Sequence, residues 1–312
     1  MHKRFVNHCT IELTIIPDGP ILIKSGKEGA DPTKPDMEFV ETYQRQGKSL
    51  YLPGSSLKGA IRAHAERIVR TIPEDKKSEG LWANDPLNDK YEYLEKKAAP
   101  DIYRLSSFTD QMFGNTSIAS RVRIEDAYPA DLKSLKIEER NGVAIDRVFG
   151  SVAVGPFNYQ VCTAGEFKTK IHLKNFSLAQ LGLIGLVLRD LDAGWFGLGF
   201  AKSRGMGTVA VQYEKATVQY PPCVLENNEI HLLGSDKKWS HTSLLGAGEF
   251  LSEEERQSYG FPANDRQVTP VAAQEMLLGL GVELCWQGDE LVPDLFQRAV
   301  SSWRQIVEVK VA

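Results

Sequence analysis

The strongest constraint on the fold is a strand–helix–strand pattern that occurs twice along the chain. Alternation of apolar and polar residues, which is typical of half-buried strands, occurs at 9–15, 122–124, 167–173 and 208–213. Two segments with apolar side chains at helical spacing, 57–69 and 178–191, lie within the two units. The resulting order predicts an α+β fold, a ferredoxin-like βαββαβ domain with long inserted loops.

Serine residues mark the expected starts of the helices. Ser55 or Ser56 is predicted to cap the first helix and Ser177 the second, because a hydroxyl oxygen at the N-cap accepts a free backbone N–H. Ser252 and Glu255 have the spacing of a capping box. A further helix is therefore expected near residue 253.

Changes in composition divide the chain. Residues 1–214 carry both strand–helix–strand units and are predicted to form one domain, with a charged insertion, interrupted by prolines, at about 74–120. The pattern then changes, so residues 215–312 are predicted to be a C-terminal extension. Its spacing predicts amphipathic helices at 270–278 and 295–303 and a closing strand at 307–311.

The composition is that of an ordinary globular protein, with 42% hydrophobic and 25% charged residues. No apolar stretch approaches the roughly 20 residues of a membrane span, and the start of the chain lacks a secretory pattern. We therefore expect a cytoplasmic protein with no membrane partner. The four cysteines include no C-x-x-C pair, which argues against a disulfide framework and a cysteine-based zinc site.

The segment Tyr51–Arg62, YLPGSSLKGAIR, leads from a Pro-Gly turn into a helix. Free N–H groups at a helix N-terminus favour an anion, and a Lys and an Arg four residues apart share one helix face. A capped helix with a solvated basic face explains the same spacing, and spacing alone does not separate the two. The phosphate contacts that the first interpretation predicts are Gly54, Ser55, Ser56, Lys58, Arg62 and Arg67.

A second segment, Gly194–Gly207, reads GWFGLGFAKSRGMG. A dinucleotide-binding fingerprint needs the order strand, loop, helix, whereas this loop runs from a helix to a strand. Glycines around Lys202, Ser203 and Arg204 would instead let a polyanion approach the backbone closely. A plain flexible turn is the alternative. The formal net charge of −4 shows no basic excess, so nucleic-acid binding would depend on such local positive charge.

The two segments strongly resemble hallmark motifs of the CRISPR-associated RAMP superfamily, and the resemblance extends over roughly residues 9–213. It implies a modified ferredoxin-like (RRM-like) domain in a backbone subunit of a type III effector complex. Such subunits stack along a guide RNA and grip its backbone, so the implied partners are guide RNA, target RNA and other RAMP subunits. The long C-terminal extension is atypical and suggests a type III-D-like complex.

The resemblance also implies a projecting thumb hairpin at about 148–162, where Phe157 or Tyr159 could wedge into the guide–target duplex. The chain departs from the family pattern at the base of this hairpin, where Phe149-Gly150 replaces the usual Thr-Gly pair. Some members carry a zinc knuckle after the first helix. This chain has no cysteine between residues 10 and 161, so no zinc is expected.

Backbone subunits of this type often cleave target RNA with an aspartate in the loop after the first strand. Asp36 best matches that position and Asp31 is the reserve candidate. The carboxylate of Asp36 would help to hold Mg²⁺ or Mn²⁺ during attack of a ribose 2′-hydroxyl on the adjacent phosphate. A solvated loop aspartate in a non-catalytic backbone or capping subunit is the alternative interpretation.

A third hypothesis is an endonuclease that processes the precursor of the guide RNA with a general-base histidine. His64 lies within the first helix rather than at its mouth, which favours a structural role for it. Structural roles are also expected for Asp126, Asp146 and Asp192.

Overall fold

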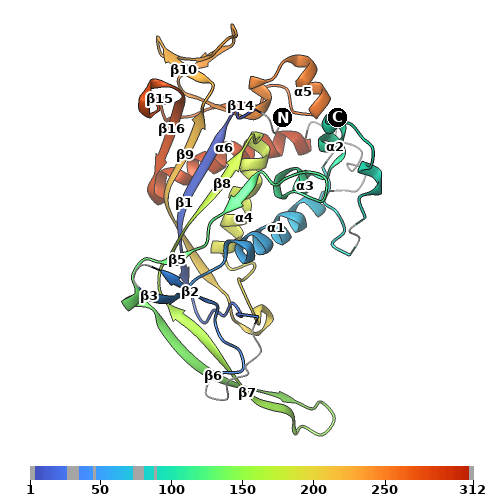
Figure 1. Ribbon diagram of the computed structural model, residues 1–312, viewed down its shortest axis with the longest axis vertical. Helices are drawn as coiled ribbons and strands as arrows, with labels where there is room; N and C mark the ends of the chain where they lie inside the picture. Colours follow the sequence, from blue (N-terminus) through green and yellow to red (C-terminus); the bar gives the residue numbers. More distant parts are fainter. Residues whose placement is uncertain (1–3, 27–34, 45–46, 73–80, 88–89, 309–312) are drawn as a thin grey trace.

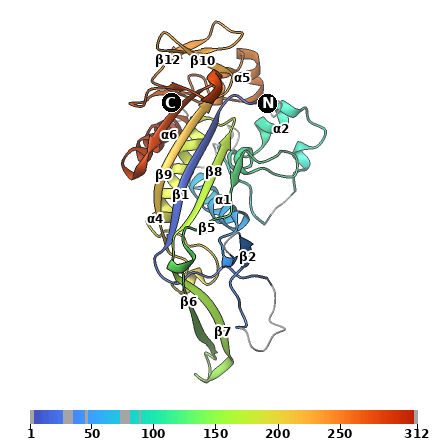
Figure 2. The same ribbon diagram turned by 60° about the vertical axis from the view of Figure 1, so that its left-hand side comes forward.

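The computed structural model describes residues 4–26, 35–44, 47–72, 81–87 and 90–308. Four strands of its main antiparallel sheet stand in the order β9-β1-β8-β4. Helices α1 (Gly54–Arg70) and α4 (Leu178–Asp192) lie on one face of this sheet (Figures 1 and 2). The α+β, ferredoxin-like fold predicted from the sequence is confirmed. The strands are β1 (His8–Pro17), β4 (Val122–Ile124), β8 (Phe167–Lys174) and β9 (Val209–Tyr220).

The alternation in β1 sorts its side chains between the two faces of the sheet. Cys9, Ile11 and Leu13 are buried in the core, whereas Thr10 and Glu12 lie on the face away from the helices and are partly exposed. We call the face opposite α1 and α4 the open face of the sheet.

The two helices start differently. Ser177 caps α4 as predicted, and it forms a capping box with Gln180. The predicted serine cap of α1 is wrong, because the N-cap is Pro53 and makes no side-chain cap. Ser55 and Ser56 lie in the first turn of α1 instead.

Within the predicted insertion, the described residues form a short 3₁₀ helix and two short α-helices beside α1 (Figure 1). They are η2 (Glu92–Leu94), α2 (Ala99–Leu105) and α3 (Phe108–Phe113). Residues 73–80 and 88–89 of this insertion lie outside the described part of the chain.

The thumb hairpin is longer than predicted. It consists of β6 (Lys136–Ile145) and β7 (Val152–Ala164), which pair antiparallel and project from one end of the molecule (Figures 1 and 2). The predicted boundaries of 148–162 are wrong for the first strand, which begins at Lys136. Two short strands, β2 (Glu41–Gln44) and β3 (Gly47–Leu50), pair with each other near its base, and β5 (Tyr128–Pro129) pairs with β8.

The C-terminal part of the chain continues the same sheet. Strand β9 passes through residue 214, where the predicted domain ends, and β16 (Val282–Gln287) pairs along its free edge. Helix α6 (Gly288–Glu308) packs on α4. A Cβ at Gly182 would lie 2.6 Å from the Ala299 carbonyl oxygen, so this glycine permits the close approach of α6. The division at 214 stays a prediction, but the following residues share the core of the domain.

Other predictions for this part have mixed outcomes. The capping box of Ser252 and Glu255 begins α5 (Glu253–Tyr259), and the helix predicted at 295–303 lies within α6. No α-helix forms over 270–278, where strand β15 (Gln274–Glu275) and the 3₁₀ turn η6 (Leu277–Gly279) lie instead, and Val307 and Glu308 belong to α6 rather than to a strand. Residues 309–312 lie outside the described part. The remaining strands are β10 (Cys223–Glu226), β11 (Glu229–Leu232), β12 (Lys238–Ser240), β13 (Ser243–Leu245) and β14 (Arg266–Val268).

Candidate nucleic-acid interface

Backbone hydrogen bonds join four segments into one surface at the thumb end of β1. Phe200 N donates to Leu22 O at 2.7 Å, Val40 N to Ile23 O at 2.9 Å, and Gln160 N to Met37 O at 3.0 Å. We call this surface the loop layer, defined by residues 20–25, 36–40, 158–162 and 194–207. The loop layer joins the predicted catalytic loop, the thumb and the glycine-rich loop, which lie far apart in the sequence.

Two glycines of the glycine-rich loop allow its backbone to pack closely against other backbone groups. Gly199 has φ +78°, and a Cβ there would overlap the Leu22 carbonyl oxygen. Gly207 has φ +89°, and a Cβ there would overlap the Leu198 carbonyl oxygen. Only glycine fits both the backbone conformation and the close approach at these two positions.

The positive charges of this loop are exposed. Lys202, Ser203 and Arg204 form the single 3₁₀ turn η4 on the surface. The Arg204 guanidinium lies 5.0 Å from the centre of the Phe200 ring, and Lys24 Nζ lies 5.3 Å from the same centre. Cation–π contacts of this kind leave the charge available to an anion. The sequence did not single out Lys24, because its neighbourhood depends on the pairing of Leu22 with the glycine-rich loop.

Asp36 lies at the base of the thumb. Its side chain is exposed, and Oδ2 accepts a hydrogen bond from Asn158 N at 2.9 Å. The predicted wedge residues Phe157 and Tyr159 flank Asn158, with ring centres 6.4 Å apart. The reserve candidate Asp31 lies outside the described residues.

The donor set around Asp36 is small. Within the described residues, Oδ1 of Asp36 accepts no hydrogen bond, and no group of three or more His, Cys, Asp or Glu side chains is placed to hold a metal ion. Mg²⁺ is often held by one or two carboxylates, with waters and substrate phosphates completing its shell. Asp36 therefore fits a divalent ion only if RNA and water supply the remaining ligands.

The exposure of the thumb aromatics differs from the expectation for a wedge. Phe157 is half-buried, and its ring lies where a Cβ at Gly142 would stand, 2.6 Å from the nearest ring carbon. Tyr159 packs against the core. Phe149, which the sequence placed at the base of the hairpin, lies in its turn and has 84% of its surface exposed. Phe149 is therefore the more accessible ring, and the wedge role of Phe157 and Tyr159 stays a prediction.

The N-terminus of α1 is partly occupied by the protein itself. Gly54 N donates to Asp126 Oδ1 at 2.7 Å, and a Cβ at Gly54 would overlap the Ile124 carbonyl oxygen. Lys58 Nζ donates to Ser120 Oγ at 2.8 Å. Burial, followed by the nearby Arg62 guanidinium, lowers the pKa of Lys58. Lys58 is thus a half-buried cation close to another cation.

Arg62 has an internal role. Its guanidinium contacts Asp110 Oδ1 at 2.8 Å, Glu66 Oε1 at 2.8 Å and the Gly114 carbonyl oxygen at 2.9 Å. These contacts tie α1 to α3, so Arg62 has fewer N–H groups for a phosphate. Arg67 is exposed but five residues further along, and so does not share the i, i+4 face of Lys58 and Arg62.

His64 connects α1 to α4 and to the glycine-rich loop. Its Nε2 lies 2.8 Å from Asp190 Oδ2, and its ring stacks on Phe196 with centres 4.3 Å apart. The side chain is buried between α1, α4 and the glycine-rich loop. This environment matches the structural role expected for His64.

The three aspartates for which structural roles were expected all accept backbone hydrogen bonds. Asp126 binds Gly54 N, Asp192 binds Val211 N, and Asp146 binds the N–H groups of two residues in the thumb turn, Val148 and Phe149.

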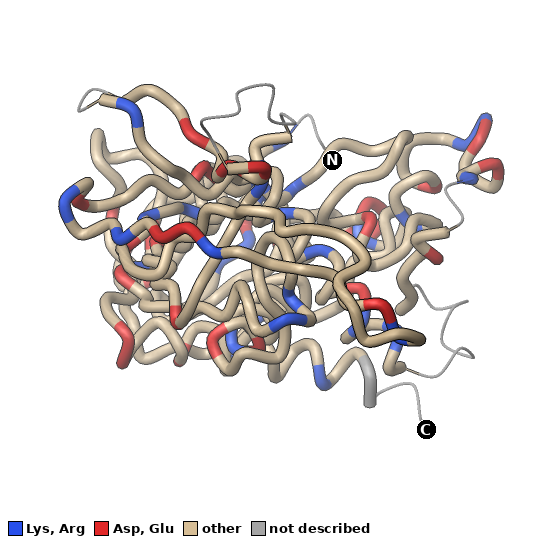
Figure 3. The backbone as a smooth tube through the Cα atoms, turned by 90° about the horizontal axis from the view of Figure 1, so that it is seen from below, with Lys and Arg blue, Asp and Glu red and all other residues tan. Residues whose placement is uncertain are grey.

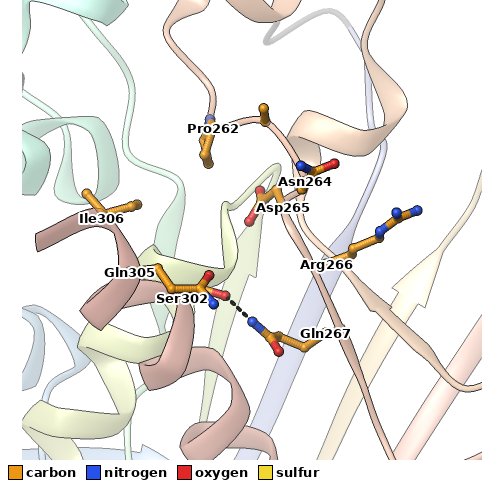
Figure 4. A pocket seen from close by; sticks show the side chains of 9 residues that line it. Pro262, Asn264, Asp265, Arg266, Gln267, Ser302, Gln305 and Ile306 are labelled. Carbon is orange, nitrogen blue, oxygen red and sulfur yellow. Dashed lines mark hydrogen bonds between the residues drawn. The ribbon is translucent and has the colours of Figure 1, made fainter. Parts of the chain in front are cut away.

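Charged residues of both signs are spread over the chain, and one cavity lies apart from the loop layer. Lys and Arg positions are interspersed with Asp and Glu along the backbone (Figure 3). A cavity of about 740 Å³ lies away from the loop layer, beside α6 (Figure 4). One of its walls is closed by a hydrogen bond from Gln267 Nε2 to Ser302 Oγ of 3.1 Å. This cavity contains none of the predicted site residues.

Comparison with known proteins identifies the family of this chain. The family model of the RAMP superfamily matches residues 14–210. The chain belongs to the RAMP superfamily. The match runs from β1 into β9 and covers α1, the thumb and the glycine-rich loop. Membership in the RAMP superfamily supports a CRISPR-associated RNA-binding subunit. A search of curated proteins found no match.

No helix in the described part of the chain has the length and apolar character needed to cross a membrane.

Proposed function

We propose that this RAMP protein is a backbone subunit of a type III CRISPR effector complex that grips guide RNA and cleaves the paired target RNA. The observation that carries the proposal is the loop layer, which joins Asp36, the thumb and the glycine-rich loop. The cleavage that the family resemblance implies uses a carboxylate beside the RNA, and this surface supplies one. The C-terminal strands and α6 favour a specialised subunit of a type III-D-like complex.

The grip on guide RNA is electrostatic. Lys202 and Arg204 are exposed, and Lys24 joins them around Phe200. Cations that contact phosphates supply affinity without reading bases. Sequence specificity is then left to pairing between guide and target, as in other RNA-guided effectors.

Cleavage would proceed by attack of a ribose 2′-hydroxyl on the adjacent phosphate. The 2′-hydroxyl would lose its proton to water, a 2′,3′-cyclic phosphate would form, and the bond to the 5′-oxygen would break and release a 5′-hydroxyl. Asp36 is exposed beside the thumb, with Oδ1 directed to no other described group. Mg²⁺ or Mn²⁺, when bound, would neutralise the charge that develops on the phosphate and the leaving oxygen. Asp36 would hold this ion, and the thumb would hold the target strand in place.

The test is cleavage of a guide-complementary RNA by the reconstituted complex in Mg²⁺. Asp36→Ala should abolish one cut while complex and guide RNA remain intact. Asp18→Ala is the matched control, because Asp18 is an exposed aspartate in the turn after β1. An unchanged cutting pattern for Asp36→Ala would refute the catalytic assignment.

A non-catalytic backbone or capping subunit is the second candidate. It is favoured by the hydrogen bond between Asn158 N and Asp36, which gives this carboxylate a structural task at the thumb base. The same experiment separates the two, because only the catalytic subunit loses a cut. Processing of the precursor RNA has less support, since His64 is buried against Asp190.

A further inference from the structure

A second basic surface lies apart from the loop layer. A cavity of about 490 Å³ is lined by the start of α1, by edge strand β4 and by the open-face ends of β1 and β8. No Asp or Glu is among the described residues that line it. Its basic residues are His8, Lys58, Arg121, Arg123, His172 and Lys174.

Aromatic rings gather on the open face beside this cavity. The rings of His8 and His172 are stacked, with centres 5.5 Å apart and planes 18° apart. Phe5, with 47% of its surface exposed, lies against His8 with ring centres 5.5 Å apart. Single-stranded RNA is recognised by stacking of unpaired bases on aromatic side chains, including His and Phe.

The positive charge of the cavity is only partly neutralised. Glu125 Oε1 lies 2.9 Å from both His172 Nε2 and Arg123 Nη2, at the border of the cavity. Lys174 has no carboxylate within ion-pair distance among the described residues, and Lys58 contacts only the hydroxyl of Ser120. Arg123 and His172 thus share one carboxylate, and Lys58 and Lys174 have none within ion-pair distance among the described residues, which favours binding of an additional anion.

The electrostatics of His8 are consistent with this excess. Burial lowers the pKa of His8 most strongly. A hydrogen bond to Gln219 opposes that shift, and the nearby His172, Arg123 and Lys174 lower the pKa further. At neutral pH His8 is therefore an uncharged ring suited to stacking, and Lys174 is the charged neighbour.

We propose that this cavity binds one nucleotide of single-stranded RNA. Its phosphate lies beside Lys174 and Lys58, and its base or ribose lies against the rings of His8 and His172. The inference depends on the proposed function, since it requires an RNA-binding subunit, but it does not depend on cleavage at Asp36. It adds strands β1, β4 and β8 to an RNA surface otherwise built from loops.

The charge is tested with the full-length protein and a fluorescently labelled single-stranded RNA. Lys174→Gln should weaken binding about tenfold and lower the slope of log affinity against log salt by about one. Lys168→Gln is the matched control, because Lys168 lies on the same strand and face but is paired with Glu214 at 2.7 Å, outside the cavity. This control should leave binding unchanged.

The stacking is tested with two variants at one position. His8→Ala should weaken binding about tenfold, within the range known for loss of one base–aromatic contact. His8→Phe keeps a flat ring and should restore most of the affinity. A role limited to the hydrogen bond with Gln219 would give no such rescue, because that bond is lost in both variants. A role in packing the ring against Phe5 and His172 would lower the melting temperature of His8→Ala along with its RNA affinity, whereas loss of a base contact lowers the affinity alone.

The outcomes separate this inference from the proposed function. If Lys202→Glu weakens RNA binding but Lys174→Gln and His8→Ala do not, the proposal that this cavity binds a nucleotide is wrong. The proposed grip on guide RNA by the loop layer is then retained. If the Lys174 and His8 variants weaken association with neighbouring subunits and leave RNA affinity unchanged, the cavity is a protein contact and the inference is wrong. If the wild-type chain binds no RNA, the proposed function and this inference both fail.

Discussion

Raising the pH should weaken the attachment of the C-terminal part of the chain to α4, because a buried carboxyl group connects them. Asp265 is 3% exposed, and its Oδ1 accepts a hydrogen bond from Leu178 N, at the start of α4, at 2.9 Å. The Asp265 carbonyl oxygen accepts a second bond from Gly246 N at 2.7 Å. Oδ2 has no partner among the described groups. Figure 4 shows Asp265 among the residues that line the cavity beside α6.

Burial raises the pKa of Asp265 to about 7, from a usual value of 3.8. This difference of about three pH units corresponds to ~4 kcal/mol of folding free energy. Between these two values the folded chain holds a proton that the unfolded chain has lost. The contribution to stability is therefore complete below pH ~4 and is lost as the pH rises through about 7, with a slope of up to ~1.4 kcal/mol per pH unit.

Asp265→Asn removes the titration and keeps an oxygen that can accept from Leu178 N. Urea unfolding followed by tryptophan fluorescence between pH 5 and 8 should show the wild type losing stability relative to Asp265→Asn as pH rises. Groups that titrate in both proteins cancel in this difference. Asp236→Asn, at an exposed site, should follow the wild-type curve. A difference between Asp265→Asn and wild type that does not change with pH would refute the reasoning.

Two further predictions concern the glycine-rich loop. Gly199→Ala should destabilise the protein by ~3 kcal/mol and weaken RNA binding, because the new Cβ overlaps the Leu22 carbonyl oxygen at φ +78°. Gly205→Ala, at φ +79° with open space around it, should lose only ~1 kcal/mol. Equal losses in the melting curves would contradict the packing argument. His64→Ala should destabilise by ~3 kcal/mol, because Asp190 and Phe196 lose a buried partner. It should not affect any cutting of repeat RNA, and loss of such cutting by a folded variant would reinstate a catalytic histidine.

The core of the fold was predictable because its signal is local. Alternation in β1 places Ile11 inward and Thr10 outward, and the structure keeps this assignment. The first thumb strand was missed for the opposite reason. Lys136–Ile145 pairs only with β7 and is exposed along most of its length, so no buried face imposes alternation on its sequence.

The C-terminal part was harder to predict because its signals depend on distant contacts. Gly182 and Gly185 lie within the apolar helix segment predicted at 178–191, and both mark the approach of α6. A Cβ at Gly185 would lie 2.7 Å from Phe296. The helix predicted at 270–278 is wrong because Gln274 and Glu275 pair with β16, and Leu278 has φ +74°.

The candidate site shows the same limit. The sequence places Lys58 and Arg62 on the same helix face and gives no reason to treat them differently. In the structure, Asp110 from the insertion pairs with Arg62, and Lys58 has no acidic partner among the described residues. Helical spacing specifies the face that a side chain occupies, not the partner that a distant segment brings to it. The loop layer could not be predicted from the sequence either, because no local pattern pairs Leu22 with Phe200.

The acidic total charge is compatible with an RNA grip because the cations differ in their pairing. On the open face, Lys168 pairs with Glu214 and Lys170 with Glu12, so these charges offer little to an anion. Lys24 and Arg204 contact an aromatic ring instead, and neither has a carboxylate within ion-pair distance among the described residues. A bound phosphate would contact the unpaired cations, so their positions matter more than the net charge of the chain. The unpaired cations of the loop layer lie beside the thumb and Asp36. The distribution of acidic partners, more than the number of basic residues, therefore determines where this chain can hold RNA.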